Sequence, residues 1–140
     1  MPVLACCAVA VALLFSVTVR AQEKEQRTPA QQKIDSQLLY EIYRARGEAE
    51  RKGVPPGPTG VRIDRRGRAL VELRAAPTTS LLKAIRGAHG QVLSFSTQYR
   101  SIIARVPLLE IEDLAARAGV EFIQPAPEAI TGPKSQGGVR

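Results

Sequence analysis

The sequence predicts a small α+β domain over residues 61–127, and three observations support this fold class. Several short segments alternate apolar with polar residues, which is the pattern of half-buried strands. Two other segments repeat their apolar residues at helical spacing. Hydrophobic residues make up 44% of the 140-residue chain and aromatic residues only 4%, so the core must be mainly aliphatic. Strands and helices that share one short region indicate α+β architecture.

The first half of this domain is expected to hold a turn, a strand and a helix. Residues 64–67 have the composition of a turn, and residues 68–74 form a strand-like run that follows it. Residues 78–80 supply N-cap side chains for a helix that ends at Gly90. We also expect the hairpin over residues 61–73 to add an edge strand to the sheet.

The second half repeats the same order. Residues 91–96 and 101–106 predict two strands joined by a turn, and residues 120–123 predict a last strand. Between them, Pro107 opens a helix that Gly119 is expected to end in a left-handed cap. The apolar face of that helix is Leu108, Ile111, Leu114, Ala115 and Ala118. The order β-α-β-β-α-β predicts a ferredoxin-like sandwich, with four antiparallel strands and both helices on one face.

Other segments surround the domain. Residues 22–33 are polar and expected to be disordered. Residues 34–52 predict an amphipathic helix with Asp35 as its N-cap. The expected apolar stripe of that helix is Leu38, Leu39, Ile42 and Ala45. Residues 53–60 are rich in proline and glycine and predict a linker, and residues 128–140 predict a flexible tail.

The N-terminus predicts export. Residues 3–19 form an uncharged apolar run, and small side chains stand three residues and one residue before Gln22. This pattern predicts a signal peptide over residues 1–21, with cleavage between Ala21 and Gln22. No basic residue precedes the run, and the run reaches the short end of a membrane-spanning length, about 17–25 residues. An uncleaved membrane anchor therefore remains an alternative.

The residue types needed for catalysis are scarce. Cys6 and Cys7 lie inside the apolar run, so the cleaved chain would contain no cysteine. The only histidine, His89, stands at the end of a predicted helix, where it more often caps carbonyl groups than performs chemistry. The acidic residues of the last helix lie in its first turn, where the helix dipole favours them; they are Glu110, Glu112 and Asp113. We expect no enzymatic activity, no cofactor and no metal site.

The residues of the domain, in addition to their order, follow a known pattern. The segments concerned are 34–38, 68–74, 81–85, 89–92, 99–107, 114–115 and 120–125. A β-branched strand ends in Val106-Pro107, a helix contains Leu114-Ala115, and a final strand runs into Pro125. This arrangement resembles the propeptides of bacterial subtilisin-like serine proteases, over roughly residues 32 to 127 and without a catalytic domain.

The resemblance implies a function. Such a propeptide packs its sheet against the protease and lays its C-terminal segment along the active-site cleft, acting as a folding chaperone and product-like inhibitor. The corresponding cleft-binding segment here is Ile123, Gln124, Pro125, Ala126, Pro127 and Glu128. The implied partner is a subtilisin-like serine protease, in the same gene product or separate from it. The implied location is secreted or periplasmic, with no stable membrane association after cleavage.

Two other functions remain alternatives. One is a general envelope domain that binds some other protein through its sheet. The other is a basic nucleic-acid-binding module, since the chain carries a net charge of +7. RNA-binding sheets of this topology stack bases on aromatic residues of their central strands, whereas residues 69–73 and 101–105 contain none. The sequence therefore favours a protein partner and no nucleic acid.

Overall fold

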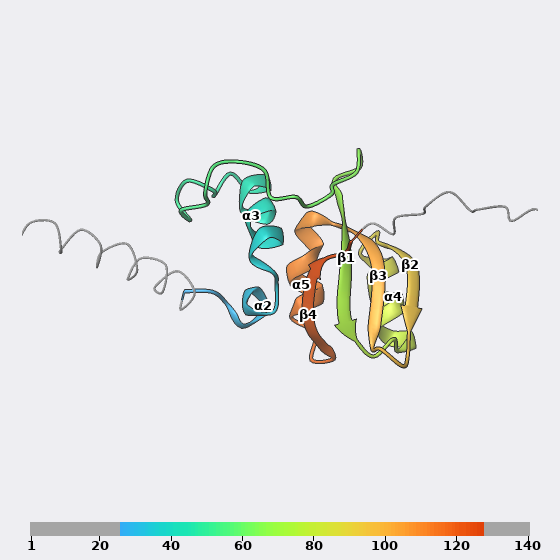
Figure 1. The fold of residues 1–140 in the computed structure, drawn as a ribbon. Helices are drawn as coiled ribbons and strands as arrows, with labels where there is room; N and C mark the ends of the chain where they lie inside the picture. The colour runs from blue at the N-terminus through green and yellow to red at the C-terminus, as the bar shows by residue number, and fades with distance from the viewer. Residues whose placement is uncertain (1–25, 128–140) are drawn as a thin grey trace, which may run out of the picture.

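The computed structural model describes residues 26–127. Figure 1 shows one antiparallel sheet of four strands with helices packed against it. In chain order the elements are α2 (Pro29–Gln32), α3 (Ser36–Ala45), β1 (Arg68–Ala75), α4 (Thr79–Gly87), β2 (Gln91–Ser96), β3 (Ser101–Pro107), the 3-10 helix η1 (Leu108–Glu110), α5 (Ile111–Ala115) and β4 (Val120–Pro125). The α+β class and the antiparallel four-stranded sheet are thus confirmed. The expected signal peptide, its cleavage point and the tail 128–140 lie outside the described residues.

The strands lie in the order β2-β3-β1-β4. β1 pairs with β3 along all but its last residue, from Arg68 opposite Pro107 to Arg74 opposite Ser101. On its other side β1 pairs with β4, with an irregularity between Arg74 and Ala75. β2 pairs only with β3 and carries a bulge between Val92 and Ser94. β2 and β4 are therefore the two edges of the sheet.

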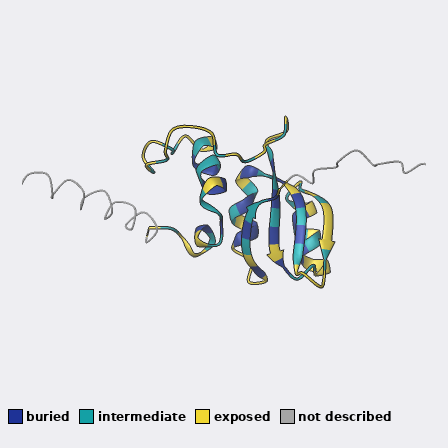
Figure 2. Cartoon of the chain, in the orientation of Figure 1, coloured by how far each residue is buried: buried dark blue, intermediate teal, exposed yellow. Residues whose placement is uncertain are grey.

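The core lies between the sheet and the helices. β1 and β3 alternate buried with more exposed residues, as strands with one covered face do. Both α4 and α5 lie behind the sheet in the view of Figure 1, and the buried stripes of the strands are visible in Figure 2. The buried strand residues on this face include Ala69, Val71, Leu73, Ile102, Ala104 and Val106. The helices contribute Leu81, Ile85, Ile111 and Leu114.

The segment before α3 is ordered, so the expectation of disorder over residues 22–33 is wrong for the part that the structure describes. The side chain of Thr28 accepts a hydrogen bond from the backbone of Gln31, and Gln31 returns one to the backbone of Thr28. Pro29 begins the helix with a backbone angle that already suits it. This reciprocal capping box explains how a four-residue helix forms in a polar segment.

Helix α3 is part of the core and is shorter than the predicted 34–52. Asp35 is confirmed as its N-cap, accepting a hydrogen bond from the backbone of Gln37. The helix ends at Ala45 because Gly47 takes a left-handed conformation and the Glu48 N–H turns back to the Tyr43 carbonyl. The buried residues are Leu38, Leu39, Ile42 and Tyr43, so Tyr43 takes the place expected for Ala45.

The hairpin over residues 61–73 does not add an edge strand. Its first arm forms only an isolated bridge, between Ile63 and Ala69. β1 already has β3 on one side and β4 on the other, so no free side remains along most of its length. The predicted turn itself is present, with the Asp64 carboxylate accepting hydrogen bonds from the backbones of Arg66 and Arg68.

The Pro/Gly stretch 53–60 is fastened to α3. Arg44 donates hydrogen bonds to the carbonyls of Pro55 and Gly57, at 3.0 and 2.6 Å. The Thr59 hydroxyl donates to Glu41 at 2.6 Å. The sequence marked this stretch as a break between helix and sheet, and the structure shows that polar contacts hold it against the helix.

The last helix also ends earlier than expected. It begins as η1, continues as α5 and stops at Ala115, which leaves Ala118 exposed. Gly119 does not take a left-handed conformation. The Val120 N–H instead donates to the Arg117 carbonyl at 3.1 Å, and this tight turn leads directly into β4 without a glycine cap.

Candidate functional site

The face of the sheet opposite α4 and α5 is the candidate interaction surface. We call it the open face and define it by the strand residues that alternate with the buried ones. On β1 these are Leu70, Glu72 and Arg74, on β3 they are Ser101, Ile103 and Arg105, and on β4 they are Phe122 and Gln124. Arg74 and Arg105 are exposed, and the others are partly exposed.

A hydrogen-bonded carboxylate lies at the centre of the open face. The Ser101 hydroxyl donates to Glu72 at 2.7 Å, and the Gln124 amide donates to the other carboxylate oxygen at 3.0 Å. These bonds link β3, β1 and β4 through their side chains. The Ser101 bond, followed by the Gln124 bond, lowers the pKa of Glu72 below its ordinary value. Glu72 is therefore charged at neutral pH, and each of its carboxylate oxygens accepts a hydrogen bond. This arrangement favours a structural role over acid–base chemistry.

This lowered pKa predicts a pH-dependent contribution to stability. It is present above the unfolded pKa of glutamate, about 4.3, and is lost as the pH falls through the lower folded value. Ser101→Ala should lower the free energy of unfolding by about 1 kcal/mol at pH 7 and by less at pH 3, as measured by urea titration. Ser94→Ala on the exposed edge strand is the control. An equal loss for Ser101→Ala at both pH values would contradict this explanation.

The first part of the predicted cleft-binding segment belongs to the sheet. Ile123 is buried. Its backbone N–H donates to the Lys33 carbonyl at 2.8 Å and its carbonyl accepts from the Asp35 N–H at 2.9 Å, so it pairs with the segment before α3, which we call the N-terminal segment. Gln124 bonds to Glu72, and Pro125 lies opposite Val71 in the β-ladder. These three residues are therefore held in the sheet by contacts within the chain.

The second part of that segment leaves the sheet. Ala126 is buried, and its N–H donates to the Leu70 carbonyl at 3.1 Å, so it extends the contact with β1 by one residue. Pro127 is exposed, and Glu128 lies outside the described residues. The part that is open to a partner therefore begins at Pro127, close to the end of β4.

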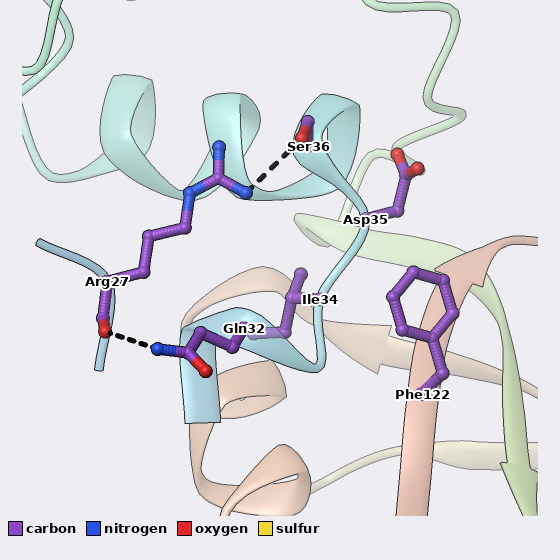
Figure 3. A pocket seen from close by; sticks show the side chains of 6 residues that line it. All are labelled: Arg27, Gln32, Ile34, Asp35, Ser36 and Phe122. Carbon is purple, nitrogen blue, oxygen red and sulfur yellow. Dashed lines mark hydrogen bonds between the residues drawn. The ribbon is translucent and has the colours of Figure 1, made fainter. Parts of the chain in front are cut away.

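A shallow pocket lies where the N-terminal segment meets β4 (Figure 3). It is lined by Arg27, Gln32, Ile34, Asp35, Ser36 and Phe122. Arg27 donates to the Ser36 hydroxyl at 3.3 Å, while its buried Nε has no hydrogen-bond partner among the described residues. The sequence did not predict this pocket, because its walls come from segments far apart in the chain.

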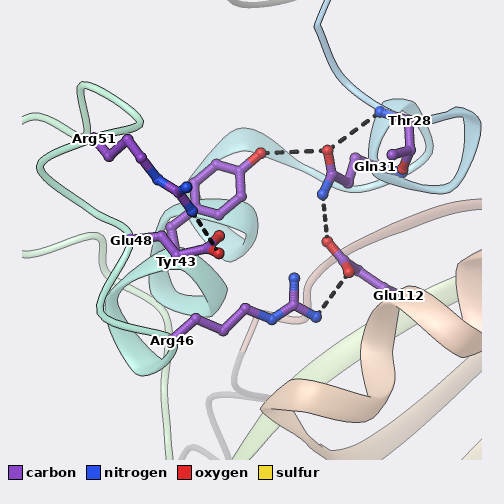
Figure 4. Close-up of polar contacts among 7 residues, drawn as sticks. All are labelled: Thr28, Gln31, Tyr43, Arg46, Glu48, Arg51 and Glu112. Atoms are coloured by element: carbon purple, nitrogen blue, oxygen red, sulfur yellow. Dashed lines mark hydrogen bonds and ion pairs between the residues drawn. The ribbon is translucent and has the colours of Figure 1, made fainter.

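A polar cluster joins the N-terminal segment to α5 (Figure 4). Glu112 accepts a hydrogen bond from Gln31 at 2.7 Å and forms an ion pair with Arg46 at 2.8 Å. The hydrogen bond to Glu112 is the main reason that the pKa of Arg46 is raised. The Tyr43 hydroxyl donates to Gln31 at 3.4 Å. The helix dipole alone would explain Glu112, whereas the structure shows that Glu112 binds Gln31 of α2 and Arg46 at the end of α3.

His89, the chain's only histidine, lies in the loop between α4 and β2. His89 is exposed and has a left-handed backbone with φ 59°. Its backbone N–H donates to the Arg86 carbonyl. Within residues 26–127 no cluster of three histidine, cysteine or acidic residues is arranged to hold a metal ion. In the same part of the chain no helix has the length and apolarity needed to cross a membrane.

No protein-family model matches this chain, and comparisons with curated proteins and with solved structures return no match.

Proposed function

We propose that this chain is an exported, non-catalytic module of the subtilase-propeptide type. It binds a subtilisin-like serine protease and acts as a folding chaperone, a product-like inhibitor or both. The observation that carries the proposal is the open face, with the C-terminal segment leaving the sheet at one end of it.

The proposed fold is the ferredoxin-like sandwich. The strand order β2-β3-β1-β4 supports it, because each helix then connects two parallel strands that have an antiparallel strand between them. The alternating burial of β1 and β3 supports crossovers that both place their helix on the same face. This arrangement leaves the other face available for a partner.

The composition of the open face suits a protein partner. Leu70 and Ile103 provide partly exposed apolar surface next to Glu72, while Arg74 and Arg105 provide charge nearby. An apolar centre with polar groups around it is the usual anatomy of a protein interface. An anionic Glu72 at the centre is less suited to the phosphate groups of nucleic acid.

The C-terminal segment supports the inhibitory part of the proposal. Residues 120–125 are already extended in β4, and Pro127 continues from them as an exposed residue. An extended chain can add a strand to the substrate-binding edge of a protease, with backbone hydrogen bonds providing affinity. Pro127 has no N–H to donate and limits the conformations of its neighbour, so a cleft-bound chain would resist cleavage there.

Export completes the proposal. Residues 1–21 act as the signal peptide, and cleavage between Ala21 and Gln22 releases the chain to a secreted or periplasmic location. The protease partner is encountered there, either joined to this module or as a separate chain. The apolar run and the small residues before Gln22 support this step.

The test is a titration of a subtilisin-type protease with the chain lacking residues 1–21. We expect micromolar chain to slow the hydrolysis of a chromogenic peptide. Ile103→Arg on the open face should raise the inhibition constant at least tenfold, because it places a charge in the apolar part of the contact. Leu109→Arg, on the 3-10 helix and away from the open face, is the matched control and should inhibit like the original chain. Folded chain that leaves hydrolysis unchanged would refute the proposal.

A further inference from the structure

The two edges of the sheet differ. β4 is covered by the chain itself, since the backbones of Lys33 and Asp35 pair with Ile123. β2, at the other edge, pairs only with β3, and no second strand among residues 26–127 covers its outer side. Figure 1 shows β2 at one end of the sheet, and Figure 2 shows that it is exposed over most of its length.

The uncovered edge lacks two of the features that usually prevent pairing, which are charged side chains and proline. Residues 90–99 contain no charged side chain and no proline, although the whole chain carries a net charge of +7. Natural edge strands are commonly protected by lysine, proline or a bulge. Here the bulge lies between Val92 and Ser94, so the second half of β2 remains regular.

Exposed apolar side chains concentrate at the same edge. Leu93, Phe95 and Tyr99 are 43%, 55% and 75% exposed, and all three lie within seven consecutive positions. A local concentration of this kind, on an otherwise strongly charged chain, indicates a surface that is covered by another protein.

We propose that β2 pairs with β2 of a second copy of this chain, antiparallel and about a two-fold axis at Phe95. The two sheets then form one continuous sheet in the dimer. This inference goes beyond the proposed function and does not depend on it, because the open face and the C-terminal segment are not used.

The register follows from the faces of the regular half of β2. Phe95 lies opposite Ile102 and thus on the helix side, while Ser94 and Ser96 lie opposite Ile103 and Ser101 on the open side. A two-fold axis at Phe95 sets this ring against its own copy and sets Ser94 against Ser96 of the second copy. Side chains then meet on matching faces, as a ladder requires.

The distribution of charge favours a second copy as the occupant. Residues 94–96, the regular part of β2 that would pair across the axis, carry no charge, so no two basic residues meet within the ladder. Arg100 is already paired with Glu121 in its own chain. Repulsion between two copies of net charge +7 acts mainly at longer range, where salt screens it within about 8 Å at physiological ionic strength. The dimer should therefore strengthen as salt is added.

Sedimentation velocity tests the proposal, on protein purified after expression of all 140 residues and studied from 1 to 100 µM. We expect a monomer–dimer equilibrium whose dimer fraction rises with concentration and from 0.15 to 0.5 M sodium chloride. Phe95→Lys should abolish the dimer, because two charges would meet at the axis. Leu109→Lys introduces the same charge in place of an apolar side chain that is 51% exposed on η1 and should leave the dimer intact.

A second variant, Phe95→Thr, places a β-branched residue that suits a strand and should raise the dimer dissociation constant at least tenfold while the chain stays folded. Far-UV circular dichroism confirms folding for each variant. A chain that stays monomeric at 100 µM overturns the proposal, as does a dimer that Phe95→Lys and Phe95→Thr leave unchanged. Loss of the dimer in Leu109→Lys as well would place the interface elsewhere and would also overturn it.

Discussion

Replacing Ile42 with alanine is expected to destabilise the whole domain, not only the helix that contains it. Ile42 is completely buried on α3, where it belongs to the same core as the sheet residues Ile123 and Leu73. Removing buried methylene and methyl groups from isoleucine costs about 2–5 kcal/mol, which is a large part of the 5–15 kcal/mol that stabilises a typical domain. Urea unfolding followed by circular dichroism should show one earlier transition for helix and sheet together.

The control for Ile42→Ala is Ile63→Ala, the same chemical change at a side chain that is 40% exposed. That variant should lose less than about 1 kcal/mol. A separate early transition for α3 in Ile42→Ala, with the sheet unaffected, would show that the N-terminal helix is an attached element and not part of the core.

Gly90→Ala is expected to have a comparable effect for a different reason. A Cβ at this position would lie 2.7 Å from the Ile85 carbonyl oxygen and 3.2 Å from the Arg105 carbonyl oxygen. Both atoms belong to the backbone, one on α4 and one on β3, so neither can move aside cheaply. We expect a loss of about 1–3 kcal/mol or more, since the added group must push the helix away from the sheet.

Gly87→Ala is the matched control for Gly90→Ala. Gly87 is the last residue of α4, and a Cβ there would meet nothing within 4 Å. Alanine favours helix over glycine by up to about 1 kcal/mol, so this variant should be neutral or slightly stabilised. Thermal unfolding of both variants provides the comparison, and equal melting temperatures would show that the close approach at Gly90 is relieved without cost.

Local patterns predicted much of the sheet and of the helix starts. The bounds of β2 and the start of β3 follow from alternation between turn residues. The N-caps Asp35 and Thr78 follow from side chains that bond to the backbone two or three residues later. These features depend on neighbours in the sequence, and for that reason the sequence alone reveals them.

The features that were missed depend on distant partners. The bridge from Ile34 to Ile123 and the bond from Gln31 to Glu112 join segments more than 80 residues apart, and no local pattern marks them. The hairpin at residue 63 failed to become an edge strand because β4 occupies the place beside β1. The same contacts determine which part of the C-terminal segment can bind a partner. Ile123 is already paired within the chain, whereas Pro127 is not in the sheet.

The protease contact itself is tested most directly by hydrogen–deuterium exchange of the chain with and without a subtilisin whose catalytic serine has been replaced. We predict new protection at β1 and β3 beneath the open face and at the residues that follow Pro127, with little change on α4. Exchange that is the same in both samples at saturating enzyme, or protection confined to α4 and α5, would contradict the account.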